Sequence, residues 1–137
     1  ATLAARDSRV KLLGRIDDAE LARQYRQATA FVFPSLYEGF GIPPLEAQAC
    51  GCPVISANTA SMPEVLQDSV LYFDPYETAS ITQAMRTILQ DAPLREALRA
   101  KGLANIQRFN WQTSARKVSD LLDSALATTT KATARAA

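Results

Sequence analysis

Residues 31–46 join an apolar run to a helix start through a loop that contains two glycines. The run at residues 30–33 is continuously apolar and ends at a proline, as expected for a parallel strand buried on both faces. The next helix is predicted to begin near Pro43 or Pro44, where a missing N–H costs nothing, and to end at Gly51. A strand that leads directly into a helix is the repeating unit of a parallel α/β sheet.

The rest of the chain continues this alternation of strand and helix. We therefore expect an α/β fold, a partial Rossmann-like parallel sheet of about four strands with helices on both faces. Residues 1–127 would form one domain and residues 128–137 a disordered tail. Trp111 is expected in the core, on the apolar stripe of the last helix. Further strands are predicted at residues 10–14, 53–56 and 70–73, and helices at residues 17–28, 63–66, 81–89, 93–98 and 110–125.

Two carboxylates, Glu38 and Glu46, bracket the loop and the helix start. Backbone N–H groups at a helix start are unpaired and suit a phosphate. Carboxylates suit sugar hydroxyls, which are hydrogen-bond donors. The segment therefore suits a ligand that is part phosphate and part polyol, and a nucleotide sugar is such a ligand. The alternatives are that Glu46 only caps its own helix and that Glu38 is a solvated loop residue.

Composition argues against several other classes of function. The net charge is +1, with no basic block outside the tail, so no nucleic-acid partner is expected. No apolar run approaches the roughly 20 residues that span a bilayer. Cys50 and Cys52 lack zinc-site spacing and the chain has no histidine, so we expect buried fillers in a reducing cytoplasm. A dehydrogenase-type Rossmann motif would need a third glycine where Pro44 stands.

The segment and its flanks resemble the donor-binding region of the family 4 retaining glycosyltransferases, which have the two-domain GT-B architecture. The two glutamates have seven residues between them, which is the glutamate-pair signature of that family. The resemblance continues through residues 62–65 to residues 109–111 and covers roughly residues 10–125. It implies transfer of a glycosyl group, of the hexosyl type, from a nucleotide sugar to an acceptor with retention of configuration, in glycan or polysaccharide biosynthesis.

The same resemblance implies roles for particular residues. Glu46 would bind the ribose hydroxyls of the donor. Glu38 would be the catalytic residue, beside the transferred sugar, where it supports an oxocarbenium-like transition state while the leaving phosphate acts as the base. No metal or other cofactor is expected. The remaining expected donor-binding residues are Gly39, Phe40, Gly41, Ile42 and Arg15. Phe40 is equally compatible with a packing role, and Arg15 with an exposed surface position.

Parts of the family pattern have no counterpart in this chain. Donor domains of this kind usually start with strand–helix units that supply an arginine and a lysine for the diphosphate, and no segment matches them. We therefore expect the C-terminal part of a longer cytoplasmic enzyme, which can associate peripherally with a membrane. A glycan or lipid-linked acceptor would bind an N-terminal domain, and this chain alone would be inactive. Its exposed sheet edge favours self-association. A non-catalytic nucleotide- or sugar-binding module is the alternative.

Overall fold

A three-stranded parallel sheet forms the centre of the computed structural model, which describes residues 7–135 and side chains as far as residue 126. The strands are β1 (Phe31–Phe33), β2 (Val54–Ala57) and β3 (Leu71–Phe73), in the spatial order β1-β2-β3. Both strand pairs are parallel, with Phe31 opposite Val54 and Ile55 opposite Leu71, so all three strands point in the same direction. Their carboxyl ends therefore meet at one edge, which is where parallel sheets bind ligands.

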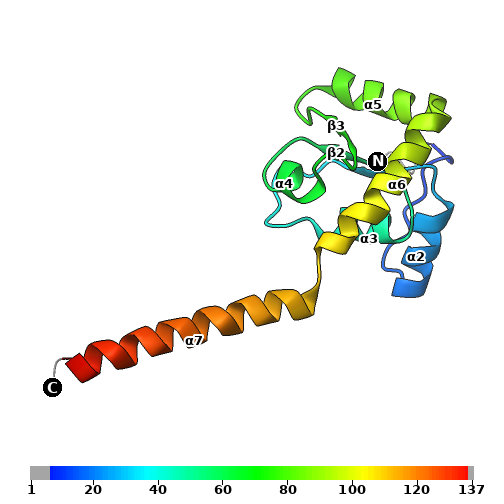
Figure 1. Ribbon diagram of the computed structural model, residues 1–137. Helices are drawn as coiled ribbons and strands as arrows, with labels where there is room; N and C mark the ends of the chain where they lie inside the picture. The colour runs from blue at the N-terminus through cyan, green and yellow to red at the C-terminus, as the bar shows by residue number, and fades with distance from the viewer. Residues whose placement is uncertain (1–6, 136–137) are drawn as a thin grey trace.

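Helices follow the strands in the predicted order (Figure 1). Two of the predicted helix starts are confirmed by their capping bonds. Asp17 Oδ1 accepts a hydrogen bond from Glu20 N at 2.8 Å, and Asn110 Oδ1 accepts from Gln112 N at 2.8 Å. The helical elements are α2 (Asp18–Gln27), α3 (Ile42–Ala49), α4 (Met62–Leu66), α5 (Thr78–Gln90), α6 (Ala92–Asn105), the short 3₁₀ helix η1 (Ile106–Arg108) and α7 (Trp111–Arg135).

Side chains of β2 alternate between two apolar clusters, one on each face of the sheet. Val54 packs in the cluster that α2, α3 and α4 form, while Ile55 and Ala57 pack in the cluster that α5 and α6 form. All three residues are at most 1% exposed. Apolar side chains at three of its four positions suit a strand that is buried on both faces. The prediction of helices on both faces is confirmed.

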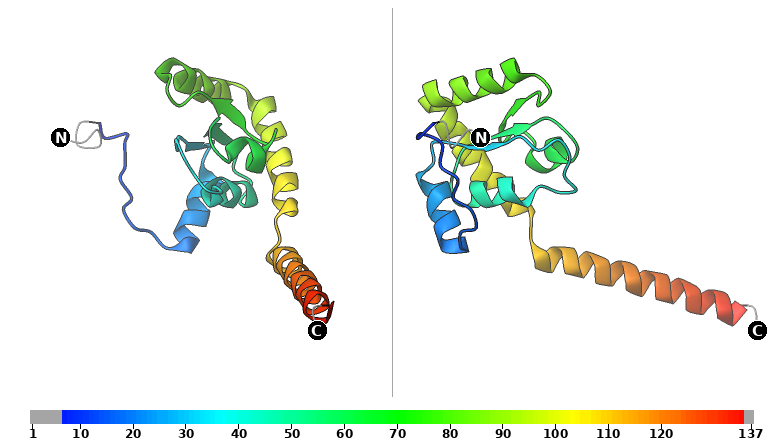
Figure 2. Two further views of the ribbon diagram at one scale, coloured as in Figure 1. Left: turned by 90° about the vertical axis from the view of Figure 1, so that its left-hand side faces the viewer. Right: turned by 180° about the vertical axis from the view of Figure 1, so that it is seen from behind.

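The predicted strand at residues 10–14 is wrong. This segment runs away from the sheet as irregular chain (Figure 2). Leu12 and Leu13 are 73% and 52% exposed, and only Gly14, with φ of +63°, behaves as the expected stop. A strand exists only where a neighbouring strand pairs its N–H and C=O groups. In the part of the chain described here no neighbour does so, and the sheet has three strands instead of about four.

The last helix, α7, extends away from both layers (Figures 1 and 2). Trp111 is 88% exposed and Val118 is 56% exposed, so the expectation that Trp111 lies in the core is wrong. The predicted stripe is present on the helix, and its side chains are exposed as far as residue 126. The backbone of residues 128–135 is helical instead of irregular.

Cys50 and Cys52 are both free thiols between α3 and β2. Cys52 is 3% exposed, and burial raises the pKa of its thiol to about 11. The thiol is therefore protonated at neutral pH and behaves as a small apolar side chain, as predicted. Among the helices that the structure describes, none has both the length and the apolar character needed to cross a bilayer.

Candidate functional site

The loop between β1 and α3 lies at the carboxyl edge of the sheet and carries the predicted site. Gly41 ends this loop as the N-cap of α3, with φ of +86°, a left-handed conformation that favours glycine. A Cβ atom at Gly41 would overlap the methyl group of Met62. Gly39 has no positive φ and has open space around it. Of these two glycines, only Gly41 thus adopts the left-handed conformation that glycine permits.

Glu38 is half-buried and is fixed by hydrogen bonds from two serines. Ser35 Oγ donates to Glu38 Oε1 at 2.9 Å, and Ser61 Oγ donates to the backbone carbonyl of Glu38 at 2.9 Å. A carboxylate that accepts a hydrogen bond from a fixed hydroxyl has a defined direction. The interpretation of Glu38 as a freely solvated loop residue is therefore wrong.

Glu46 is exposed and lies one full turn inside α3, because this helix begins at Ile42. The third helical position, from which a glutamate could cap the helix, is occupied by Pro44. The described residues give the Glu46 carboxylate no hydrogen bond or ion pair. Tyr25 of α2 lies close enough to respond to this charge. Burial raises the pKa of Tyr25 most, and the negative charge of Glu46 raises it further. The capping alternative is wrong, and the carboxylate is open to a ligand.

The start of α3 offers few free backbone amide groups. Pro43 and Pro44 occupy its second and third positions and have no N–H. The amides that can face an anion are therefore those of Phe40, Gly41 and Ile42, which precede the prolines. Phe40 also has a packing role, because its ring meets that of Phe109 edge-on at a centroid distance of 5.4 Å.

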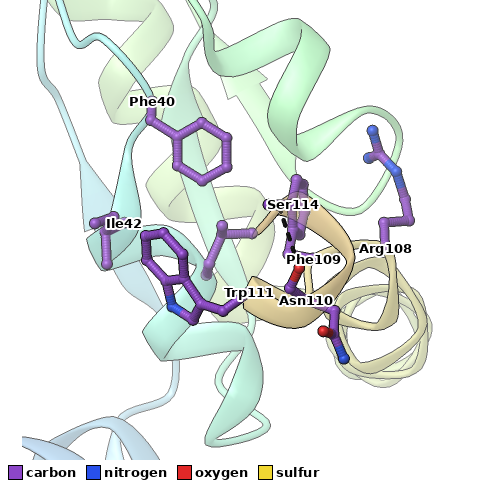
Figure 3. A pocket seen from close by; sticks show the side chains of 8 residues that line it. Phe40, Ile42, Arg108, Phe109, Asn110, Trp111 and Ser114 are labelled. Atoms are coloured by element: carbon purple, nitrogen blue, oxygen red, sulfur yellow. Dashed lines mark hydrogen bonds between the residues drawn. The ribbon is translucent and has the colours of Figure 1, made fainter. Parts of the chain in front are cut away.

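A cavity of about 430 Å³ lies between the β1–α3 loop and the start of α7 (Figure 3). Phe40 of the loop and Ile42 at the start of α3 line one side, and Phe109 and Trp111 line the other side. A second cavity of about 390 Å³ lies at the carboxyl ends of β2 and β3. Neither cavity is lined by Glu38 or Glu46, so the structure does not bring the two carboxylates into one enclosed pocket.

Arg15 does not contribute to either cavity. It lies in the irregular segment before α2 and is exposed, which agrees with the surface interpretation, and its contact with a donor stays a prediction.

Sequence reasoning missed two residues near the β1–α3 loop and α4, Phe109 and Arg108. Arg108 Nη1 donates to the carbonyl of Val65 at 3.2 Å and Nη2 to that of Glu64 at 3.4 Å, which ties the end of α4 to η1. Among the side chains that the structure describes, up to residue 126, no group of three or more possible metal ligands is found.

Residues 5–105 match the family model described as "Glycosyl transferases group 1". The chain belongs to this family. It is 42% identical over 107 residues to the O-antigen chain mannosyltransferase B of Escherichia coli, which covers 78% of this chain and 28% of that protein. It is 32% identical over 122 residues to a D-inositol 3-phosphate glycosyltransferase of Corynebacterium kroppenstedtii, which covers 88% of this chain and 27% of that protein. The chain thus spans about a quarter of the length of these relatives.

Solved structures of group 1 glycosyl transferases and their relatives agree with the fold. Sucrose-phosphate synthase from Thermosynechococcus elongatus superimposes with a TM-score of 0.77 at 31% identity, over 88% of this chain and 31% of that chain. The C-terminal domain of a glycosyl transferase group 1 family protein from Francisella tularensis gives 0.65 at 29% identity, over 77% of this chain and 55% of that chain. The predicted α/β class with a parallel sheet, which GT-B glycosyltransferases share, is confirmed.

Gly41→Ala in this group 1 glycosyl transferase chain is expected to lower the free energy of unfolding by about 1–2 kcal/mol. The alanine would have to adopt the left-handed φ of +86° and displace the buried Met62 side chain. Urea unfolding followed by far-ultraviolet circular dichroism measures the change. Gly39→Ala is the matched control, because nothing lies near its Cβ position, and it should shift stability by less than about 0.5 kcal/mol. Equal effects at both glycines would contradict the argument.

Proposed function

We propose that this chain is part of the donor-binding domain of an enzyme that transfers a glycosyl group from a nucleotide sugar to an acceptor, with retention of configuration. Membership of the glycosyl transferases group 1 family supports the reaction class. The observation that carries the proposal is the loop at the carboxyl end of β1, which presents an oriented Glu38 and leads directly into the helix that carries an open Glu46. The proposed mechanism belongs to the family 4 type.

The nucleotide half of the donor is assigned to Glu46 and the loop amides. A ribose offers two neighbouring hydroxyl donors, and a carboxylate without a partner in the described chain can accept from both. Its place within a helix fixes the position of its backbone. The amides of Phe40, Gly41 and Ile42 suit the distal phosphate or the sugar, because they lie where the chain enters α3.

The sugar half of the donor is assigned to the side of Glu38. During transfer, the bond between the anomeric carbon and the leaving phosphate oxygen breaks while a bond to the acceptor oxygen forms on the same face. The proton of the acceptor hydroxyl passes to the leaving phosphate. Positive charge develops on the sugar ring, and a negative carboxylate held in place by Ser35 stabilises that charge without reorganising. Glu38 acts by positioning and electrostatics, not as a nucleophile.

A nucleotide-activated mannose is the first donor to test, because the 42% identical relative is named a mannosyltransferase. The acceptor class is a glycan or a lipid-linked glycan, bound by a part of the enzyme outside this chain. We propose a cytoplasmic enzyme that can associate peripherally with a membrane. The 137-residue chain on its own is expected to be inactive.

The test uses the full-length enzyme with GDP-α-mannose and, in parallel, UDP-α-glucose, on a mannose-terminated oligosaccharide. Release of nucleoside diphosphate measures transfer, and proton NMR of the product measures the anomeric configuration. We expect an α-linked product from an α-linked donor. A β-linked product would overturn retention. Binding of the nucleoside diphosphate without transfer from either donor would favour the non-catalytic module instead.

A further inference from the structure

The connection between β2 and α4 is a tight turn with a strained residue at its centre. Met62 N donates to the carbonyl of Thr59 at 3.1 Å, which closes the turn over residues 59–62. Ala60 has φ of +49°, although it is not glycine. A non-glycine residue in the left-handed region costs about 1 kcal/mol or more and persists only where its surroundings enforce it. This turn brings the hydroxyls of Thr59 and Ser61 to the loop that carries Glu38.

These two hydroxyls hold the two ends of a four-residue stretch, residues 35–38. Thr59 Oγ1 donates to the carbonyl of Ser35 at 3.2 Å. Ser61 Oγ donates to the carbonyl of Glu38 at 2.9 Å. Both bonds join residues that are 23 or 24 positions apart, so they tie the loop after β1 to the loop after β2. We call Thr59 and Ser61 the hydroxyl clamp.

The clamp acts on the Glu38 side chain through Ser35. Ser35 Oγ donates to Glu38 Oε1 at 2.9 Å, and a second, longer contact of 3.3 Å reaches the carbonyl of Tyr37. The shorter bond to the ionised carboxylate is the stronger of the two. Thr59 fixes the backbone of Ser35, and Ser61 fixes the backbone of Glu38. The direction of the carboxylate therefore depends on both clamp residues, although neither touches it.

The clamp residues directly precede α4, and hydrogen bonds from other elements fix both ends of this helix. At the first residue of α4, Tyr72 Oη donates to the carbonyl of Met62 at 3.1 Å. Burial, together with a smaller effect of the negative charge of Asp68, raises the pKa of Tyr72 to about 12. This hydroxyl therefore remains a donor at neutral pH. At the other end, Arg108 Nη1 donates to the carbonyl of Val65 at 3.2 Å and to Asn105 Oδ1 at 2.6 Å.

Buried polar side chains complete this support. Asn105 Nδ2 donates to Gln48 Oε1 at 3.0 Å, and Gln48 Nε2 donates to Ser69 Oγ at 2.7 Å. Gln48, Ser69 and Asn105 are all at most 6% exposed. Fully paired buried networks make a region rigid, because each group would be costly to leave unpaired. The turn at residues 59–62 therefore cannot move without disturbing the packing of α3 and α6 against α4.

We propose that Thr59 and Ser61 are positioning residues that fix the Glu38 carboxylate for the transfer step. The inference rests on the proposed function, because it takes Glu38 as the group beside the reacting sugar. It adds that the loop after β2 determines how precisely the Glu38 carboxylate is positioned. Displacing a reacting group by about 1 Å can lower the rate by about 100-fold.

Ser61→Ala and Thr59→Val, each in the full-length enzyme, test the clamp. Each is expected to lower kcat about 10- to 100-fold, with donor KM changed less than about threefold, because the carboxylate loses its direction while the nucleotide contacts remain. Ser61→Thr keeps the hydroxyl and should restore kcat to within about threefold of the original enzyme. Thr29→Val, at an exposed threonine outside the site, is the control and should leave kcat unchanged.

A double variant separates positioning from general loss of structure. Ser61→Ala added to Glu38→Gln is expected to lower kcat by less than about twofold further, because the clamp acts only through Glu38. A full additional 10-fold loss would overturn the proposal. If Glu38→Gln lowers kcat and Ser61→Ala does not, the clamp is refuted and the proposed function stands. If neither variant lowers kcat, the proposed role of Glu38 and the clamp are both refuted.

Discussion

Glu38→Gln in the full-length enzyme should lower kcat by about 100- to 1,000-fold and leave donor KM within about threefold. Glutamine keeps the size of the side chain and can still accept the hydrogen bond from Ser35. It lacks the negative charge that stabilises the positive charge on the sugar ring. The loss should therefore appear in the chemical step, and single-turnover kinetics with a saturating donor would measure it directly.

Glu96→Gln provides the control for the loss of one negative charge. Glu96 is exposed on α6 and pairs with Arg99 at 3.5 Å, and exposed pairs of this kind contribute little. Its kcat should stay within about twofold of that of the original enzyme. A Glu38→Gln enzyme with an unchanged rate would remove Glu38 from the catalytic step.

Glu46→Ala should weaken donor binding about 10- to 100-fold, with a much smaller effect on kcat. A hydrogen bond to a charged group contributes about 1.5–3 kcal/mol, and about 1.4 kcal/mol corresponds to a factor of ten. The two ribose hydroxyls would lose their common acceptor, because no other described carboxylate lies at this point of α3. Isothermal titration calorimetry with the nucleoside diphosphate alone measures this effect, since the ribose belongs to that half of the donor.

Deoxygenated ligands test which hydroxyls Glu46 accepts from. The 2′-deoxy nucleoside diphosphate should bind the original enzyme more weakly than the ribose form. The Glu46→Ala enzyme should bind both forms equally, because the acceptor is already absent. Glu38→Gln should bind both forms like the original enzyme. Discrimination between the two forms by Glu46→Ala would assign the ribose to other residues.

Local signals in the sequence predicted the elements that the chain itself can stabilise. The helix start at Asp17 and the apolar run that became β1 were recognised, because a cap and an apolar strand leave a mark on neighbouring residues. The strand expected at residues 10–14 failed, since a strand depends on a partner that no local pattern reveals. The apolar stripe that carries Trp111 was predicted correctly. Whether Trp111 is buried depends on what packs against α7, and in this structure it is exposed.

The geometry around the predicted site residues was only partly predictable from the sequence. The sequence placed the start of α3 at Pro43 or Pro44, whereas Gly41 caps a helix that begins at Ile42. This small shift moves Glu46 out of the first turn and removes the capping interpretation. The hydroxyl clamp could not be foreseen, because its bonds join residues more than 20 positions apart and serines and threonines are common in loops.

The separation of α7 from the two layers has a consequence for how the molecule fluctuates. The described side chains of α7, as far as residue 126, are all exposed, so this helix can unwind turn by turn at almost no cost to the sheet. Its amide protons should therefore exchange with solvent almost as fast as those of an isolated helical peptide. The amides of β2 should exchange only when the whole sheet opens. The chain would thus contain fast-exchanging amides in α7 and slow-exchanging amides in β2. A partner that covers the exposed face of α7 would be recognised because it slows the exchange of the α7 amides.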